Sequence, residues 1–224
     1  MPIRRVLIAN RGEIAVRIIK ACQALGLETV IIVSTPDRES LGARLADRCV
    51  CIGPAPARES YLRLENMVHA AIATGCDALH PGYGFLSERP ALAAACAENG
   101  IIFVGPSAKI IHLMGNKIEA RNIAAQSDVP VVPGQDNVTD VAGLHRVADE
   151  HGLPILIKAA AGGGGRGMKV VSDTRELATA FQTAAAEAKA AFGDGTLYAE
   201  KYVPNARHIE VQILADAHGN VVHL

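Results

Sequence analysis

The sequence predicts an α/β protein that begins with an open, doubly wound parallel sheet and continues into an incomplete second domain. Over roughly the first hundred residues, apolar runs of strand length alternate with helical patterns, which is typical of such a sheet. Residues 154–171 then hold two apolar runs on either side of a glycine tract, which predicts a hairpin. We place the boundary near Gly115, so that residues 1–115 form the first domain and 116–224 belong to the second.

The first strand–helix–strand unit covers residues 6–33. Residues 6–9 are continuously apolar, as in a strand that is buried on both faces. From residue 14 onward, apolar residues recur at near-helical spacing until Gly26 ends the helix. Residues 29–33 form the next strand. Two strands joined by a helix imply parallel pairing and a right-handed crossover.

The rest of the first domain repeats this alternation. The pattern predicts helices at 40–46, 61–73 and 90–98 and strands at 49–52, 77–80 and 101–104. Two loops follow strands, at residues 10–13 and 80–88, and ligands of doubly wound sheets bind at the carboxyl ends of strands. Both loops also fit simple connectors, because Glu13 suits a helix start and Ser87 could cap the next helix.

The second domain mixes helices with strands that alternate less regularly. Residues 118–126 and 141–151 have helical patterns, and the prolines of residues 129–134 cannot continue a helix. Asp173 begins a capping signal for an alanine-rich helix that ends near Phe192. The remaining predicted strands cover residues 196–203, 208–214 and 221–224. Since two strands alone are marginal, we expect the sequence to be part of a longer protein.

The glycine tract predicts a phosphate-binding loop. Glycines have no Cβ, so consecutive backbone N–H groups can approach an anion closely. Lys158, Arg166 and Lys169 add positive charge on and beside the tract. A flexible surface hairpin is the less favoured alternative.

The known glycine motifs fit this tract poorly. Gly162, Gly164 and Gly167 match G-x-G-x-x-G, but a strand pattern follows where that motif needs a helix. A P-loop needs Lys-Ser or Lys-Thr directly after its last glycine, and here Met168 and Lys169 follow. A hairpin tip that folds over a nucleotide remains.

Composition excludes several classes of function. The 224 residues carry a formal net charge of −1 and no long basic run, so neither nucleic acid nor a membrane surface is an expected partner. The longest apolar runs are too short to span a bilayer, and no signal-peptide core follows the first residues. The five scattered cysteines indicate reduced thiols in a cytosolic protein, and a zinc site is not expected.

Five segments together resemble the biotin carboxylases, the ATP-grasp components of biotin-dependent carboxylases such as acetyl-CoA carboxylase. They are residues 8–15, 80–88, 113–117, 162–168 and 200–202. The resemblance covers the whole chain, which corresponds to about the first half of the family's catalytic unit. It implies a Rossmann-like, pre-ATP-grasp domain over residues 1–115. Residues 116–224 would be the first part of an ATP-grasp domain, with a glycine-loop lid at about 131–204.

The resemblance also implies the reaction. In this family ATP and Mg²⁺ convert bicarbonate to carboxyphosphate, and the carboxyl group then passes to biotin on a carrier protein or domain. The implied partners are that biotin carboxyl carrier, a carboxyltransferase and a second copy in a homodimer. The implied setting is cytoplasmic and, for an acetyl-CoA carboxylase, fatty acid biosynthesis.

The resemblance assigns nucleotide contacts residue by residue. Lys117 and Lys158 would contact the phosphates of ATP, and Glu200 would bind the adenine amino group or orient Lys158. Main-chain groups of Lys201 and Val203 would bind the adenine edge. The other implied ATP-binding residues are Gly163, Gly164, Gly165, Gly167, Met168, Tyr202 and His208. Taken alone, Lys117 and His208 would be read as solvated surface residues.

No catalytic or metal-binding residue is expected within this chain. The resemblance puts the magnesium ligands, the bicarbonate-binding residues and the catalytic arginine beyond Leu224, with the C-terminal remainder absent, so the 224-residue chain is expected to lack turnover. Ala161 stands where family members often begin the glycine tract, but four consecutive glycines remain.

Two alternatives stay open. One is another ATP-grasp ligase, such as a carbamoyl-phosphate synthetase or an amino-acid ligase, which the loops at residues 10–13 and 80–88 disfavour. The other is a non-catalytic module that binds a nucleotide or another subunit.

Overall fold

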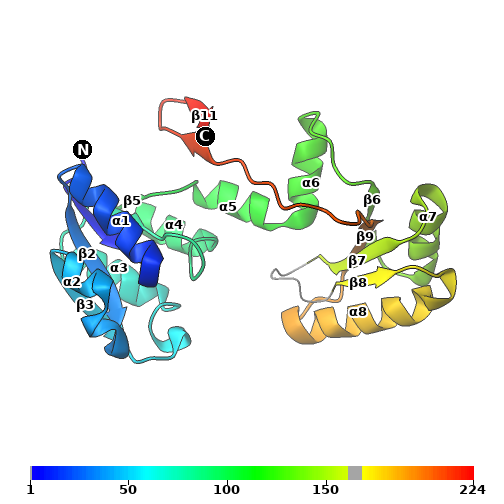
Figure 1. Ribbon diagram of the computed structural model, residues 1–224, viewed down its shortest axis with the longest axis horizontal. Coiled ribbons are helices and arrows are strands. Elements are labelled where there is room, and N and C mark those ends of the chain that lie inside the picture. Colours follow the sequence, from blue (N-terminus) through cyan, green and yellow to red (C-terminus); the bar gives the residue numbers. More distant parts are fainter. Residues whose placement is uncertain (1, 161–167) are drawn as a thin grey trace. The chain divides into compact units, whose positions relative to one another are not determined.

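The computed structural model describes residues 2–160 and 168–224 and divides into two compact units (Figure 1). The first unit is Met1–Ile123 and the second is Ala124–Leu224. Helix α6 (Lys117–Gln126) contains the point of division. No helix in the described parts of the chain is long and apolar enough to cross a membrane.

The first unit contains a five-stranded parallel sheet in the order β3-β2-β1-β4-β5. The strands are β1 (Arg5–Ile8), β2 (Glu28–Ser34), β3 (Arg48–Gly53), β4 (Ala78–His80) and β5 (Ile102–Phe103). The chain moves outward from β1 to β3 and then continues on the other side of β1 with β4. The prediction of a doubly wound parallel sheet is therefore confirmed, and its switch point lies between β1 and β4.

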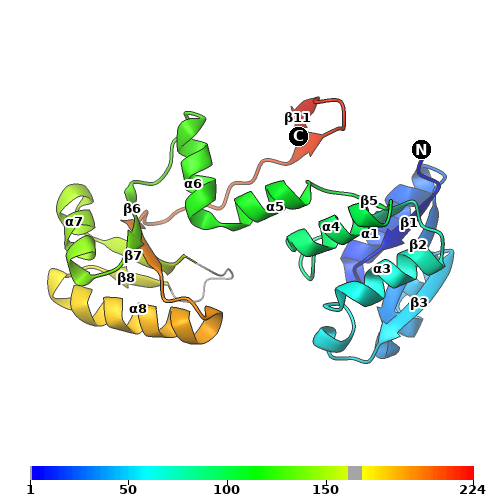
Figure 2. The ribbon, with the colours of Figure 1, turned by 180° about the vertical axis from the view of Figure 1, so that it is seen from behind.

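Helices cover both faces of this sheet because its central strands are apolar on both sides. Val6 and Ile8 point into a cluster with residues of α1 (Gly12–Ala24) and α2 (Leu41–Leu45). Leu7 points into the opposite cluster, with α3 (Leu64–Ala73) and α4 (Pro90–Glu98). In Figure 1 α1 lies in front of the sheet, and in Figure 2, seen from behind, α3 does.

Three local predictions in this unit were wrong or incomplete. Tyr61 was placed in a helix that begins only at Leu64; instead it follows a 3-10 turn (Ala57–Glu59), with its ring in the core and its hydroxyl donating to Asp37. Ser87 does not cap α4, because the N-cap residue is Arg89 and no side-chain hydrogen bond caps the helix there. Helix α5 (Ala108–Gly115) was not predicted, although Ser107 caps it by accepting from the Ile110 N–H.

The second unit contains a four-stranded antiparallel sheet in the order β6-β9-β7-β8. Its strands are β6 (Gly134–Val138), β9 (Leu197–Lys201), β7 (Ile155–Ala159) and β8 (Lys169–Val171). Pairing of β7 with β8 confirms the predicted hairpin strands, while the glycines between them lie outside the described residues.

One face of this sheet packs against helices α7 (Val141–His151) and α8 (Leu177–Phe192). Ile155, Ile157 and Ala159 point into that core, and a 3-10 turn (Thr174–Glu176) leads into α8, which runs along the sheet in Figures 1 and 2. Because side chains alternate along a strand, Lys158 belongs to the opposite face. A parallel α/β unit is thus followed by a unit in which two helices pack on one face of an antiparallel sheet.

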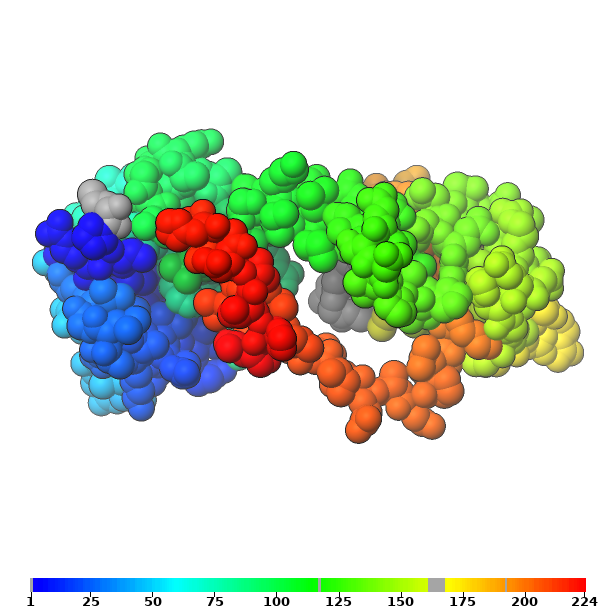
Figure 3. All heavy atoms as spheres, turned by 90° about the horizontal axis from the view of Figure 1, so that it is seen from above, coloured from blue at the N-terminus to red at the C-terminus, as the bar shows by residue number. Residues whose placement is uncertain are grey.

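The last part of the chain forms a separate hairpin. Strands β10 (Ile213–Ala215) and β11 (Val221–His223) pair antiparallel, as the turn at Gly219 predicted. The strand predicted at 208–214 forms only from Ile213, because the residues before it have no strand beside them to pair with. Residues 203–224 are all exposed, and in Figure 3 the orange stretch that leads into β10 is one chain thick.

Candidate nucleotide-binding site

Lys158 and Glu200 form an ion pair on the face of the second sheet opposite α7 and α8. Lys158 lies on β7 and Glu200 on β9, and Lys158 Nζ donates to Glu200 Oε1 at 2.6 Å. The two side chains are 22% and 11% exposed. A short, largely desolvated pair of this kind fixes the position of the ammonium group far better than a surface pair would.

Tyr198 completes this group from the position directly opposite Lys158 on β9. Lys158 Nζ lies 5.6 Å from the centroid of the Tyr198 ring, within range of a cation–π contact. Burial alone would lower the pKa of Lys158. The hydrogen bond from Lys158 to Glu200 and the charge interactions with Tyr198 and Glu200 outweigh burial, so the pKa of Lys158 is raised. Lys158 therefore carries a full positive charge at neutral pH, beside the residues that precede the glycine tract.

The main chain at the end of β9 lies next to this group. The Lys201 N–H donates to the Pro133 carbonyl at 2.9 Å, and the Tyr202 N–H donates to the Pro154 carbonyl at 3.1 Å. The Lys201 ammonium donates to the carbonyls of Gly152 and Leu153, both at 3.1 Å. With its side chain tied to the end of α7, Lys201 can offer a ligand its main chain only.

The predicted site residues fall into three groups. Strand pairing brings Lys158, Glu200 and Lys201 together, and Tyr202 and Val203 come directly after the end of β9. Met168, 45% exposed, directly precedes β8. Gly163, Gly164, Gly165 and Gly167 lie outside the described residues, as does the side chain of Lys117 at the start of α6.

His208 lies in the exposed segment before β10. Its Nε2 is 2.7 Å from Glu210 Oε1, and both side chains are exposed. Its nucleotide role stays a prediction, because its contact is with a neighbour in the chain and not with the Lys158 group. Sequence reasoning missed Tyr198, although its position two residues before Glu200 on a predicted strand puts both on one face.

The two loops at the carboxyl ends of β1 and β4 are tied together in the first unit. Asn10, 1% exposed, donates through Nδ2 to the carbonyls of Pro81 at 2.7 Å and Tyr83 at 2.8 Å. Its Oδ1 accepts the Arg11 N–H at 2.9 Å. Asn10 thus satisfies backbone groups of both loops and holds the turn that presents Tyr83.

Arg11 takes part in packing beside these loops. Its guanidinium lies 5.8 Å and 5.9 Å from the ring centroids of Tyr61 and Phe85, which stack on each other at 4.9 Å. Burial and the hydrogen bond to Asp37 raise the pKa of Tyr61 to about 12, so its hydroxyl stays a donor. These contacts explain the position of the Arg11 side chain without any bound ligand.

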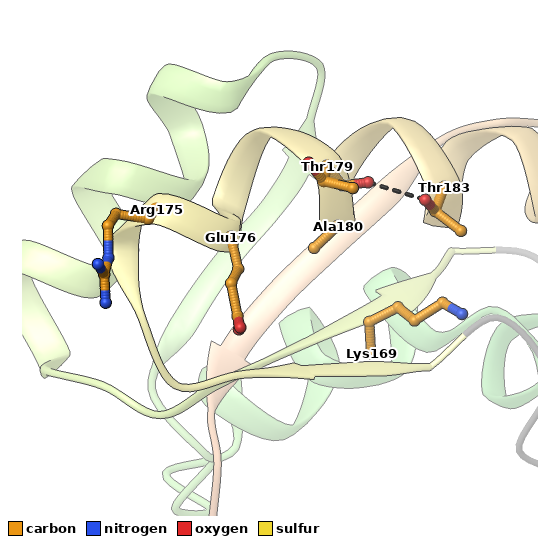
Figure 4. A pocket seen from close by; sticks show the side chains of 6 residues that line it. All are labelled: Lys169, Arg175, Glu176, Thr179, Ala180 and Thr183. Carbon is orange, nitrogen blue, oxygen red and sulfur yellow. Dashed lines mark hydrogen bonds between the residues drawn. The ribbon is translucent and has the colours of Figure 1, made fainter.

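Neither a metal site nor a second nucleotide site stands out among the described residues. They contain no group of three His, Cys, Asp or Glu side chains placed to hold a metal ion. A hollow between β8 and α8 (Figure 4) lies at the helix-covered side of the edge strand. Its cations are already paired, Lys169 with Glu187 at 2.9 Å and Arg175 with Asp173, so an anion would have to displace a carboxylate.

Comparisons with known proteins agree in sequence and in structure. Residues 2–111 match the family model "Biotin carboxylase, N-terminal domain", and residues 116–224 match "Carbamoyl-phosphate synthase L chain, ATP binding domain". Biotin carboxylase from Pseudomonas aeruginosa is 50% identical in an alignment of length 224 that covers 99% of this chain and 50% of that protein. The chain therefore spans about half the length of this relative.

Two solved structures extend the comparison. Biotin carboxylase from Campylobacter jejuni, in a β,γ-ATP complex, has a TM-score of 0.93 at 44% identity over 99% of this chain and 50% of that one. The biotin carboxylase domain dimer of 2-oxoglutarate carboxylase from Hydrogenobacter thermophilus was solved with MgADP, ADP and bicarbonate. Its TM-score is 0.90 at 44% identity, over 100% of this chain and 49% of that one.

Proposed function

The chain belongs to the biotin carboxylase family, and we propose that it provides nucleotide-binding elements of an enzyme that uses ATP to carboxylate biotin with bicarbonate. The observation that carries this proposal is the Lys158–Glu200 pair at 2.6 Å, on the face of the sheet opposite α7 and α8 and beside the main chain at the end of β9. A fixed cation next to main-chain donors and acceptors suits a ligand with an anionic tail and a base.

Each part of the nucleotide would have its own contacts. Lys158 would bind a phosphate oxygen, with Glu200 and Tyr198 holding its ammonium in place. The main chain of Lys201 and Val203 would bind the edge of adenine. Lys117, the glycines at 163, 164, 165 and 167, Met168, Tyr202 and His208 complete the proposed ATP-binding set.

Phosphoryl transfer suits such an arrangement because it depends on positioning and charge neutralisation rather than on covalent help from the protein. In the proposed reaction ATP activates bicarbonate as carboxyphosphate, and biotin on a carrier accepts the carboxyl group. Bound Mg²⁺ would supply further charge neutralisation at the phosphates. The described residues provide lysines but no carboxylate cluster for Mg²⁺, so we assign its ligands to the part of the family's catalytic unit that follows the matched segment.

The domain boundaries, the oligomeric state, the partners and the location are also proposals. The domain division at 115/116 fits the two family matches, which cover residues 2–111 and 116–224. The lid at about 131–204 is what the resemblance implies. The dimeric relative supports a homodimer of the full-length protein. We also propose a biotin carrier and a carboxyltransferase as partners, and a cytoplasmic location. Acetyl-CoA carboxylase is one candidate parent, and the 2-oxoglutarate carboxylase relative shows that others carry the same domain.

Titration calorimetry with MgATP, ADP and adenosine tests the nucleotide proposal. We expect affinity to rise from adenosine to ATP in the unchanged chain, and Lys158→Gln to remove most of that rise while leaving adenosine binding unchanged. Lys189→Gln, a change on α8, is the matched control. Equal affinities for adenosine and ATP in the unchanged chain would contradict the assignment of Lys158.

The alternative is another ATP-grasp ligase, which the description of the second family model favours. The first domain argues against it, because residues 2–111 match the biotin carboxylase model. The full-length protein distinguishes the two: ATP hydrolysis that depends on bicarbonate and increases with free biotin supports the carboxylase. Hydrolysis that depends on ammonia or an amino acid supports the alternative.

A further inference from the structure

The end of β9 has a proline opposite it on each side. On the β6 side, Lys201 is paired with Pro133, the residue just before β6; on the β7 side, Tyr202 is paired with Pro154, just before β7. In both pairs the β9 residue donates its N–H to the proline carbonyl. In an antiparallel hydrogen-bonded pair the partner normally donates its own N–H in return.

Neither proline can return that bond, because proline has no N–H. The register Gly134↔Glu200 and Gln135↔Ala199 continues directly to the pair of residues 133 and 201. Any other residue type at position 133 would therefore direct its N–H at the Lys201 carbonyl. Gly134 shows how closely the strands approach here, since a Cβ at that position would lie 2.3 Å from the Ala199 carbonyl oxygen.

The group beside the Lys201 carbonyl determines which ligand this edge of the chain can bind. Groups of residues i and i+2 project from the same edge of a strand, so the Lys201 carbonyl and the Val203 N–H lie on one edge. This edge offers an acceptor followed by a donor. A 6-aminopurine presents the complement, an amino donor beside the N1 acceptor, whereas a 6-oxopurine presents the reverse.

We propose that Pro133 is a specificity-determining residue of the nucleotide site, because it withholds the N–H that would otherwise occupy the Lys201 carbonyl and so keeps that carbonyl available to the amino group of adenine. The inference rests on the proposed nucleotide function.

The test compares ATP with purine riboside triphosphate, which lacks only the 6-amino group, in calorimetric titrations of the 224-residue chain. The unchanged chain is expected to prefer ATP by about 3- to 10-fold, the worth of one hydrogen bond. In Pro133→Ala the ratio is expected to fall close to one through weaker binding of ATP. Pro130→Ala is the control, because it changes a proline of the same connecting segment that lies outside the strand pairing, and it is expected to keep the ratio.

A second measurement works without any nucleotide. In Pro133→Ala the backbone amide introduced at position 133 is expected to exchange with solvent at least about tenfold more slowly than an exposed amide, since it donates to Lys201. Fast exchange of that amide, or an unchanged ATP preference in Pro133→Ala, would overturn the inference. Failure of the unchanged chain to bind either nucleotide would instead contradict the proposed function, and the exchange rate at position 133 would still decide whether Pro133 withholds a bond.

Discussion

Lys158 and Tyr198 lie directly opposite each other on β7 and β9, with the lysine ammonium 5.6 Å from the centre of the tyrosine ring. Glu200, two residues beyond Tyr198, holds the same ammonium from the side. Strand β9 thus supplies both contacts of the Lys158 ammonium. Because Tyr198 and Glu200 are two residues apart, they lie on the same face of β9 and together fix the position of the ammonium.

Removing the Tyr198 ring should lower the pKa of Lys158. Tyr198→Leu takes away the cation–π contact and the charge interaction that raise this pKa, while burial continues to lower it. The measurement is an NMR titration of the Lys158 side chain. Tyr198→Phe keeps the ring and should retain part of the effect. A Lys158 pKa that is the same in all three proteins would rule out this role of Tyr198.

Gly82 should tolerate alanine far less well than Gly84, although both have positive φ values of 64° and 73°. A Cβ at Gly82 would lie 2.6 Å from Ile14 Cγ2 and 2.7 Å from Asn10 Nδ2, whereas one at Gly84 meets nothing within 4 Å. We expect Gly84→Ala to lower the free energy of unfolding by about 1–2 kcal/mol through backbone strain alone. Gly82→Ala should add about 1–3 kcal/mol for overpacking. Urea unfolding measures both, and equal losses would contradict the proposed close approach.

Asn10→Ala should destabilise the first unit by about 2–3 kcal/mol, because it leaves two loop carbonyls without their donor. Asn10→Asp keeps the volume but turns an acceptor toward the same carbonyls, so we expect at least as large a loss. Asn99→Ala is the control, since Asn99 donates from an exposed position to its own helix. Unfolding followed by circular dichroism compares the three variants. A loss for Asn10→Ala no larger than that for Asn99→Ala would contradict the role of Asn10.

The charged Asp37 carboxylate should stabilise the folded state, and this stabilisation should be lost in acid. Burial works against its charge, but the hydrogen bonds from Ser34 and Tyr61 and the nearby Arg11 lower the pKa of Asp37 below its ordinary value. A carboxylate with a lowered pKa in the folded state stabilises the protein above about pH 3.9, and this contribution disappears as the pH falls through the folded-state pKa. The difference in unfolding free energy between the unchanged chain and Asp37→Asn should therefore shrink as the pH falls from about 4 toward 2. A difference that stays constant over that range would show that the Asp37 charge does not contribute.

The 224-residue chain alone should show no bicarbonate-dependent ATP hydrolysis. The chain spans half the length of its relatives, and its described residues hold no carboxylate cluster for Mg²⁺. Release of phosphate from ATP, with and without bicarbonate, provides the measurement, and a full-length relative provides the positive control. Bicarbonate-dependent phosphate release by the purified chain would refute this expectation.

Local patterns predicted the elements whose stability is itself local. Helices α4 and α7 begin and end as predicted, because a proline starts the first and Gly152 ends the second. Strand β6 was missed since Gly-Gln-Asp-Asn-Val has no strand pattern, and its pairing with β9 creates it. The strand predicted at 208–214 forms only from Ile213, for the opposite reason: the residues before it alternate well but pair with no other strand.

In the candidate site, too, local patterns were predictable from the sequence and long-range pairing was not. The resemblance left two roles for Glu200, and the contact with Lys158, 42 residues away in the chain, agrees with one of them. The sequence places Tyr198 on the same face as Glu200, but its position opposite Lys158 and that of Pro133 opposite Lys201 depend on the register of three strands. Register is a property of long-range pairing, which no local window contains.

The odd–even order of side chains on β7 also makes the site sensitive to chain length. Deleting one residue between Pro154 and Lys158 would turn the strand over. The Lys158 ammonium would then point into the hydrophobic core beside Leu144 and Leu177, and the Ile157 side chain would point to the opposite face of the sheet. Variants that lack one residue in this stretch should therefore lose both folding and ligand binding, whichever residue is deleted.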